Sequence, residues 1–185
     1  FVAQISENAL TAVSLAFPAQ NLMIAIGTGT GVGINALVSR SLGERNQERA
    51  NLIANNGLAL YVISGILFAI FGLLGSNLFF RAQTDDPEIV RLGTEYLRIC
   101  CLLSTAIFLQ FGFERILQAT GRTFYTMLTQ GLGAIVNIIM DPILIFGLFG
   151  APKLGVRGAA IATVFGQICA ASLACFFNKK KNDDI

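Results

Sequence analysis

The fold is decided by the stretch TFYTMLTQGLGAIVNIIMDPILIFGLFGAP, residues 123–152. Asp141 is its only charged residue, and every other side chain is apolar or uncharged and polar. About 20 consecutive apolar residues are enough for a helix to cross the hydrocarbon core of a bilayer. The stretch therefore predicts a membrane span that carries a single carboxylate.

The surroundings of Asp141 favour a role in handling a cation. An ionised carboxylate in hydrocarbon costs roughly 2.5–3.5 kcal/mol, so such acids usually face a wet cavity, a partner or a bound ion. Asn137 precedes Asp141 by four residues and therefore lies on the same helix face. Pro142 lacks an N–H and should kink or break the helix beside the acid. These residues predict an oxygen-rich spot that can serve a cation or a proton path.

A second interpretation of Asp141 stays open. By helical rise it lies about 27 Å beyond Thr123, close to the far membrane interface. There it could be a solvated N-cap of a short helix that begins at Pro142.

The composition predicts a polytopic membrane protein. Of the 185 residues, 54% are hydrophobic and only 13% are charged, against about 25% charged residues in soluble domains. The net charge of +2 gives no electrostatic footprint for nucleic acid. The sequence contains no His, which removes imidazole bases and His metal ligands and argues against an enzyme.

The charge-free stretches predict an all-α bundle of five transmembrane helices. Pro18 is the expected kink in the first, and Asp86 with Pro87 should begin the helix that leads into the third. The expected spans are residues 10–39, 52–79, 97–117, 124–149 and 158–177.

The basic residues predict how the bundle is oriented. An odd number of spans puts the two ends of the chain on opposite sides, and the more cationic side is expected to be cytoplasmic. The N-terminus would then be external, and the chain, which starts at Phe1, shows no signal peptide. The predicted cytoplasmic cations are Arg40, Arg45, Arg49, Arg115, Arg122 and Lys179 to Lys181, and the opposing ones are Arg81, Arg91, Arg98, Lys153 and Arg157.

Four glycines in the first span predict close helix packing. Gly27 and Gly31 form one small-xxx-small row, and Gly29 and Gly33 form another. Such rows let helices approach closely in lipid. The alternative is that the glycines let this span bend during transport.

Three blocks of the sequence resemble the multidrug and toxic compound extrusion (MATE) transporters. They occur in the order and spacing of the family and extend over nearly the whole chain. The blocks are ALTAVSLAFPAQNL (9–22) running into GVGINALVSRSLGERNQERAN (31–51), LQATGRTFYTM (117–127), and NIIMDPILIFGLFG (137–150) followed by LGVRGAAIATVFGQ (154–167).

The resemblance implies a two-lobe transporter with six helices in each lobe. Residues 1–185 would form a single membrane domain, the N-terminal lobe without its first helix. The second lobe would be absent from this chain and would be its missing partner.

The resemblance also implies a function and a site. Family members export organic cations and other amphipathic drugs from the cytoplasm across the cell membrane, in exchange for H⁺ or Na⁺ and with no cofactor. In some prokaryotic members an Asn and an Asp on helix five and a Thr on helix six hold the coupling cation. Asn137, Asp141 and Thr163 match these three, while the Asp contributed by helix one has no counterpart here.

The sequence departs from the family pattern at two positions. Gln118 stands where many members have a basic residue, and Glu114 stands where an Asn is common. A structural ion pair of Glu114 with Arg115 or with an Arg of the first loop is the preferred interpretation. The alternative is that Glu114 lines the cavity and attracts cationic drugs.

Other functions remain as alternatives. A flippase for lipid-linked oligosaccharides or lipids would need basic residues in mid-span to hold a pyrophosphate, and no Lys or Arg lies near the middle of a predicted span. A non-transporting membrane scaffold and an intramembrane enzyme belong to other classes. Asp85 and Asp86 could point to a prenyltransferase, but they lack the DDxxD spacing.

Overall fold

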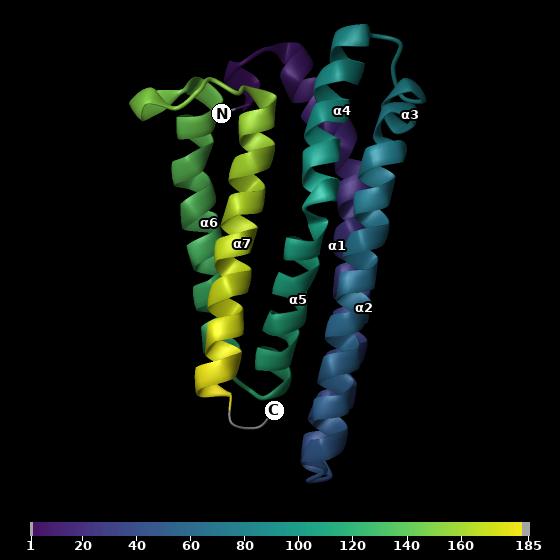
Figure 1. Cartoon of the computed structure of the whole chain (residues 1–185), viewed down its shortest axis with the longest axis vertical. Helices are drawn as coiled ribbons and strands as arrows, with labels where there is room; N and C mark the ends of the chain where they lie inside the picture. Colours follow the sequence, from purple (N-terminus) through teal and green to yellow (C-terminus); the bar gives the residue numbers. More distant parts are fainter. Residues whose placement is uncertain (1, 183–185) are drawn as a thin grey trace.

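The computed structural model describes residues 2–182, and these form a bundle of helices with no strand among them (Figure 1). The prediction that the chain shows no signal peptide concerns its start at Phe1, which lies outside the described residues. The elements are η1 (Val2–Gln4), α1 (Glu7–Gly43), α2 (Gln47–Leu74), α3 (Ser76–Arg81), α4 (Pro87–Leu102), α5 (Ser104–Ala119), α6 (Thr123–Phe146), η2 (Leu148–Gly150) and α7 (Val156–Lys181).

The helices begin where short polar side chains can cap them. The hydroxyl of Ser6 accepts a hydrogen bond from the backbone N–H of Ala9 at 3.0 Å. The Oδ1 atom of Asn46 accepts one from the backbone N–H of Arg49 at 2.9 Å. Asp86 accepts from the N–H of Glu88 at 2.8 Å, with Pro87 at the first helical position. The predicted start of α4 at Asp86 and Pro87 is therefore confirmed.

The five predicted spans are found, with one difference of shape. Helices α1, α2, α6 and α7 are each long and apolar enough to cross a membrane. The third span consists of two helices, α4 and α5, bent by 45° at Leu103. The sequence predicted a span over residues 97–117 and did not place a bend within it.

Contacts with α2 accompany the bend in the third span. The Ser104 hydroxyl donates a hydrogen bond to the carbonyl of Gly65 at 3.0 Å. A Cβ atom at Gly65 would come within 2.6 Å of the Cα of Thr105, so only glycine allows this approach. The start of α5 is thus held against α2 by a hydrogen bond and by backbone contact.

Helix α1 shows no break at Pro18 and packs through only one of its two glycine rows. It runs without interruption from Glu7 to Gly43. A Cβ at Gly27 or Gly31 would lie 2.7 Å from side chains of α5, whereas Gly29 and Gly33 have nothing within 4 Å. The packing prediction is confirmed for the first row alone.

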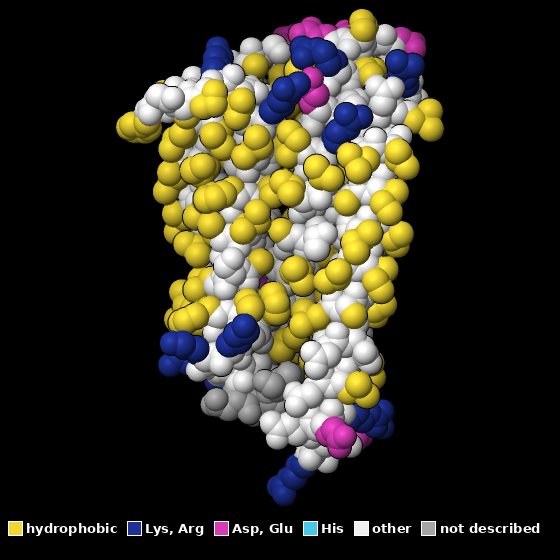
Figure 2. Space-filling view, in the orientation of Figure 1, with side chains coloured by type: hydrophobic (Ala, Val, Ile, Leu, Met, Phe, Trp, Pro, Cys, Tyr) yellow, Lys and Arg dark blue, Asp and Glu magenta, His cyan; other side chains and the backbone are white. Residues whose placement is uncertain are grey.

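Most charged residues lie near the two ends of the bundle, as the predicted spans require, and Glu114 and Asp141 within α5 and α6 are exceptions. Hydrophobic side chains cover the middle of the surface, and Lys, Arg, Asp and Glu gather above and below them (Figure 2). In the turn between α1 and α2, Arg40 Nε lies 2.8 Å from Glu44 Oε1. This hydrogen bond lowers the pKa of the Glu44 carboxyl, so the pair stays ionised at neutral pH.

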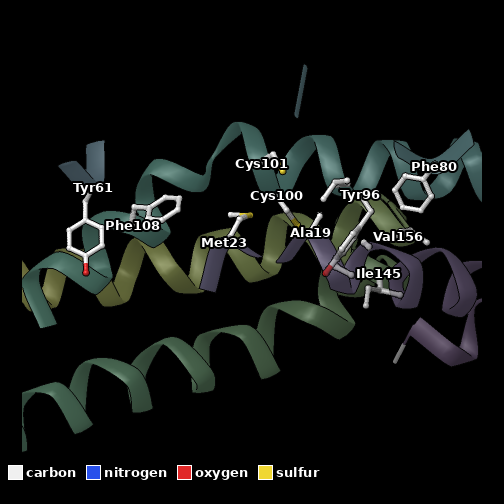
Figure 3. Close-up of a cluster of buried hydrophobic side chains, with 14 of the residues drawn as sticks. Ala19, Met23, Tyr61, Phe80, Tyr96, Cys100, Cys101, Phe108, Ile145 and Val156 are labelled. Atoms are coloured by element: carbon white, nitrogen blue, oxygen red, sulfur yellow. The ribbon is translucent and has the colours of Figure 1, made fainter. Parts of the chain in front are cut away.

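The interior is a narrow strip of apolar side chains that follows the long axis of the bundle (Figure 3). Tyr61 and Phe108 lie at one end of this strip, and Tyr96, Phe80 and Ile145 lie towards the other. The Tyr61 hydroxyl donates to the carbonyl of Gly27 at 2.8 Å, so the buried phenol is satisfied. The strip joins α1, α2 and the broken third span to α7.

Candidate functional site

Two of the three residues predicted to hold a cation meet where α6 and α7 touch. Asn137 Nδ2 donates to Thr163 Oγ1 at 3.3 Å, and the Thr163 hydroxyl donates to the carbonyl of Ala159 at 2.9 Å. Glycines allow this contact, since a Cβ at Gly166 would lie 2.7 Å from the carbonyl oxygen of Gly133. The Oδ1 atom of Asn137 accepts no hydrogen bond within residues 2–182.

Asp141 lies one turn beyond Asn137 and is not joined to the pair by a hydrogen bond. Its side chain is half-buried, and its Oδ1 atom is fully buried with no hydrogen-bond partner among residues 2–182. The Tyr96 hydroxyl, which accepts from Gln20 Nε2 at 3.1 Å, lies within electrostatic range of this carboxylate. A buried carboxylate oxygen without a donor is costly, and a proton or a cation would relieve that cost.

The interpretation of Asp141 as an N-cap is wrong. Pro142 was predicted to kink or break the helix, and it does not break it; a kink there stays a prediction. Helix α6 runs through both residues to Phe146 and ends at Gly147, whose φ of 76° is left-handed. A proline removes only one hydrogen bond, and the bond from Gly147 N to the Ile143 carbonyl at 3.0 Å carries the helix past it. The Ile138 carbonyl, four residues before Pro142, loses its helical donor and becomes a free acceptor beside Asp141.

Glu114 is buried, with only 2% of its surface exposed, but it forms no ion pair among the described residues. Its Oε1 accepts from Gln110 Nε2 and from Thr129 Oγ1, both at 2.9 Å, and its Oε2 accepts from Gln130 Nε2 at 2.9 Å. The preferred ion-pair interpretation is therefore wrong. The guanidinium of Arg115 turns away and donates to Gln118 Oε1 at 2.7 Å.

A cavity of about 340 Å³ connects Glu114 to the Asn137–Thr163 pair. No Lys or Arg is among its described lining residues. A smaller cavity of about 230 Å³ shares Phe111, Thr163 and Gln167 with it and reaches α1 at Gln20. The first cavity is lined by Gln110, Phe111, Glu114, Gln130, Gly133, Ala134, Asn137, Thr163 and Gln167.

The sequence reasoning missed the glutamines of this cavity. Gln110 precedes Glu114 by four residues, Gln130 precedes Asn137 by seven, and Gln167 follows Thr163 by four. Each spacing puts a second polar side chain on the same helix face as a predicted site residue. That repetition of polar residues within apolar spans was the signal that could have revealed them.

The donors at this site suit a hard cation better than a transition metal. The described residues contain no group of three or more His, Cys, Asp or Glu side chains that could hold a metal ion. Carboxylate, amide, hydroxyl and carbonyl oxygens are the ligands that hard cations prefer. The arrangement can therefore hold a proton on Asp141 or a small cation among oxygens.

The sequence model of the MatE family matches residues 1–143. The chain belongs to the MatE family. It is 29% identical over 177 residues to "Probable multidrug resistance protein YoeA" of Bacillus subtilis, a match that covers 94% of this chain and 38% of that protein. It is 31% identical over 183 residues to a FAD transporter of Shewanella oneidensis, a match that covers 94% of this chain and 38% of that protein.

Solved structures of MATE transporters have the same fold. An inward-facing multidrug resistance MATE family transporter matches with a TM-score of 0.92 at 31% identity, over 98% of this chain and 40% of that one. An outward-facing structure of the same description matches with a TM-score of 0.90. The chain thus spans about 40% of the length of these two-lobe membrane proteins.

Proposed function

We propose that this chain is part of the N-terminal lobe of a secondary active exporter in the cell membrane, which expels organic cations or amphipathic drugs in exchange for H⁺ or Na⁺. The observation that carries the proposal is the buried Oδ1 atom of Asp141, to which no donor of the described residues forms a hydrogen bond. The names of the MatE relatives, which include multidrug resistance and multidrug export proteins, support the same activity.

In this mechanism Asp141 alternates between a charged and a neutralised state. The ionised carboxylate attracts a proton or Na⁺. The Oδ1 atom of Asn137, the hydroxyl of Thr163 and the free carbonyl of Ile138 supply neutral oxygens nearby. Neutralisation removes the cost of a buried charge and so changes how strongly α6 packs against α7. Because the coupling ion and the drug prefer different states, the binding of one favours release of the other.

The cavity favours cationic or neutral drugs over polyanions. The buried carboxylate of Glu114 is the only charged group among its described lining residues. A dinucleotide such as the FAD named for the Shewanella relative carries phosphates, and a carboxylate without basic partners would repel them. Basic residues for a lipid-linked pyrophosphate are absent from this described lining as well, so a flippase has no support here.

Substitutions at the three site residues test the proposal. Dye efflux should be measured in vesicles that contain the full-length protein, driven by an imposed pH gradient or by an imposed Na⁺ gradient. Asp141→Asn should reduce efflux to the level of protein-free vesicles. Asn137→Ala and Thr163→Ala should each weaken the binding of the coupling cation, so that half-maximal efflux needs about five- to tenfold more of it. The reason is that one hydrogen-bonding oxygen contributes about 1 kcal/mol.

Two controls separate coupling from folding. Asp85→Asn removes a carboxylate at the end of the bundle and should leave efflux unchanged. Thr163→Ser keeps the hydroxyl and should therefore retain most of the efflux that Thr163→Ala loses. Full gradient-driven efflux by a well-expressed Asp141→Asn protein would eliminate the proposed mechanism.

A further inference from the structure

A second polar cavity lies apart from the one that holds Glu114, Asn137 and Thr163. Glu114 lies near the end of the third span, and this cavity lies at the start of that span. It has a volume of about 660 Å³ and lies between the short helix α3 and the first turns of α4. Arg81 at the end of α3 and Arg91 and Arg98 on α4 contribute three guanidinium groups to its lining. The proposed export mechanism uses none of these residues.

The cavity carries a surplus of positive charge. Its acids are Asp85 and Glu95. Both oxygens of Glu95 are already bound at 2.8 Å by the guanidinium of Arg157, which lies outside the cavity lining. Arg81 and Arg98 form no ion pair within the part of the chain that the structure describes. At least two guanidinium groups thus remain available to an anion.

A buried hydroxyl in the same cavity lacks a partner. Thr94 lines the cavity with only 8% of its surface exposed, and its Oγ1 atom makes no hydrogen bond to any described residue. A helical threonine ordinarily donates to the carbonyl one turn earlier. Thr94 follows Arg91 by three residues and precedes Arg98 by four, so the three side chains share one face of α4. A hydroxyl and guanidinium groups in one cavity lining are suitable donors for phosphate oxygens.

The surface beside the cavity is apolar and exposed. Leu102, one turn beyond Arg98 on α4, is 45% exposed, and Leu78, one turn before Arg81 on α3, is 73% exposed. Helices α2 and α4 with α5 are membrane spans, so these leucines continue from the cavity towards the hydrocarbon. A ligand that fits both parts has a phosphate at one end and acyl chains at the other.

We infer that this cavity binds the headgroup phosphate of an anionic phospholipid. Arg81 and Arg98 bind the phosphate oxygens, Thr94 donates its hydroxyl to one of them, and the acyl chains lie along Leu78 and Leu102. Asp85, at the edge of the cavity, disfavours a second anionic group, so a lipid with one negative charge fits best.

Lipid titration of the purified full-length protein tests this inference. Native mass spectrometry should be used to count bound phosphatidylglycerol and phosphatidylcholine over a concentration series. We expect phosphatidylglycerol to bind about tenfold more tightly. Both lipids present a phosphate, but the trimethylammonium group of phosphatidylcholine adds a positive charge that Arg81 and Arg98 repel, and a difference of about 1.4 kcal/mol is tenfold in affinity. The doubly substituted Arg81→Gln, Arg98→Gln protein should lose this preference. Thr94→Val should lower the affinity for phosphatidylglycerol about three- to fivefold.

Three controls make the result specific. Lys153→Gln makes the same charge change at the same end of the bundle outside the cavity and should keep the preference. Arg98→Lys keeps the charge and should retain part of it. Millimolar inorganic phosphate should not displace the lipid, since it lacks acyl chains. Equal binding of the two lipids, a preference retained by the double variant, or displacement by inorganic phosphate would each overturn the inference.

Discussion

At the scale of single residues, the Asp141 carboxylate is the least satisfied group of the α6–α7 site. Within the described part of the chain its buried Oδ1 atom has no donor, whereas Asn137 Nδ2 and Thr163 Oγ1 are already joined by a hydrogen bond of 3.3 Å. An unpaired buried polar atom costs about 1–3 kcal/mol, and more when it is charged. A small cation can remove this cost without moving the neighbouring amide and hydroxyl far.

Glu114 differs from Asp141 in its hydrogen bonds. Both oxygens of the Glu114 side chain accept from neutral side chains of the protein, whereas Asp141 Oδ1 accepts from no described residue. Glu114→Gln should reduce the export of a cationic dye about fivefold relative to a neutral substrate, since the cavity loses its only described charge. Paired efflux assays with the two substrates measure this ratio. Glu48→Gln, an exposed change at the start of α2, should leave the ratio unchanged. Loss of folded protein without a change in preference would make Glu114 a structural residue.

The sequence made part of this site predictable. Asp141 is conspicuous because charge is rare in a span, and Asn137 follows from the spacing of four residues. Thr163 required the resemblance to MATE transporters, since a lone threonine in a membrane helix usually bonds its own helix. The hydrogen bonds of Glu114 to Thr129 and Gln130 depend on how α5 and α6 pack, which the sequence pattern of either helix does not contain.

At the scale of helices, α4 and α5 show where a sequence pattern stops being informative. The charge-free stretch gave the correct position of the third span, but the 45° bend at Leu103 follows from contacts with α2. Likewise, α6 contains a proline and still continues to Phe146, because neighbouring hydrogen bonds keep the helix intact. Contacts with α2 thus accompany the bend in the third span, whereas hydrogen bonds of α6 itself carry that helix past its proline.

Gly65 is the residue that allows the α2–α5 contact. Gly65→Ala should destabilise the protein by roughly 1–3 kcal/mol, because the added Cβ would meet the backbone of Thr105. Thermal unfolding in detergent measures the change. Gly29→Ala adds the same methyl group on α1 where nothing lies within 4 Å, and it should be neutral or slightly stabilising. Equal behaviour of the two variants would contradict the close packing at Gly65.

At the scale of the whole molecule, the chain has nearly the same shape as the corresponding part of two MATE states. The TM-scores are 0.92 with an inward-facing and 0.90 with an outward-facing structure. This similarity to both states is the result expected if the described helices move largely as one body. Small changes at Asp141 would then bias the position of the whole bundle.

The distribution of cations predicts the orientation of the bundle in the cell membrane. A cysteine in place of Arg45, in the turn between α1 and α2, should react with a membrane-impermeant maleimide only after the cells are opened. A cysteine in place of Lys153, in the link before α7, should react in intact cells. The opposite pattern of labelling would reverse the predicted orientation.

The most direct test of the central claim is to measure cation exchange at Asp141. Drug should be added to the purified full-length protein in weak buffer while released protons are followed with a pH indicator, and bound ²²Na⁺ should be followed in parallel. We predict that drug displaces a proton or Na⁺ from the unsubstituted protein and neither from Asp141→Asn. Equal release from both proteins would contradict the assignment of Asp141 as the coupling site.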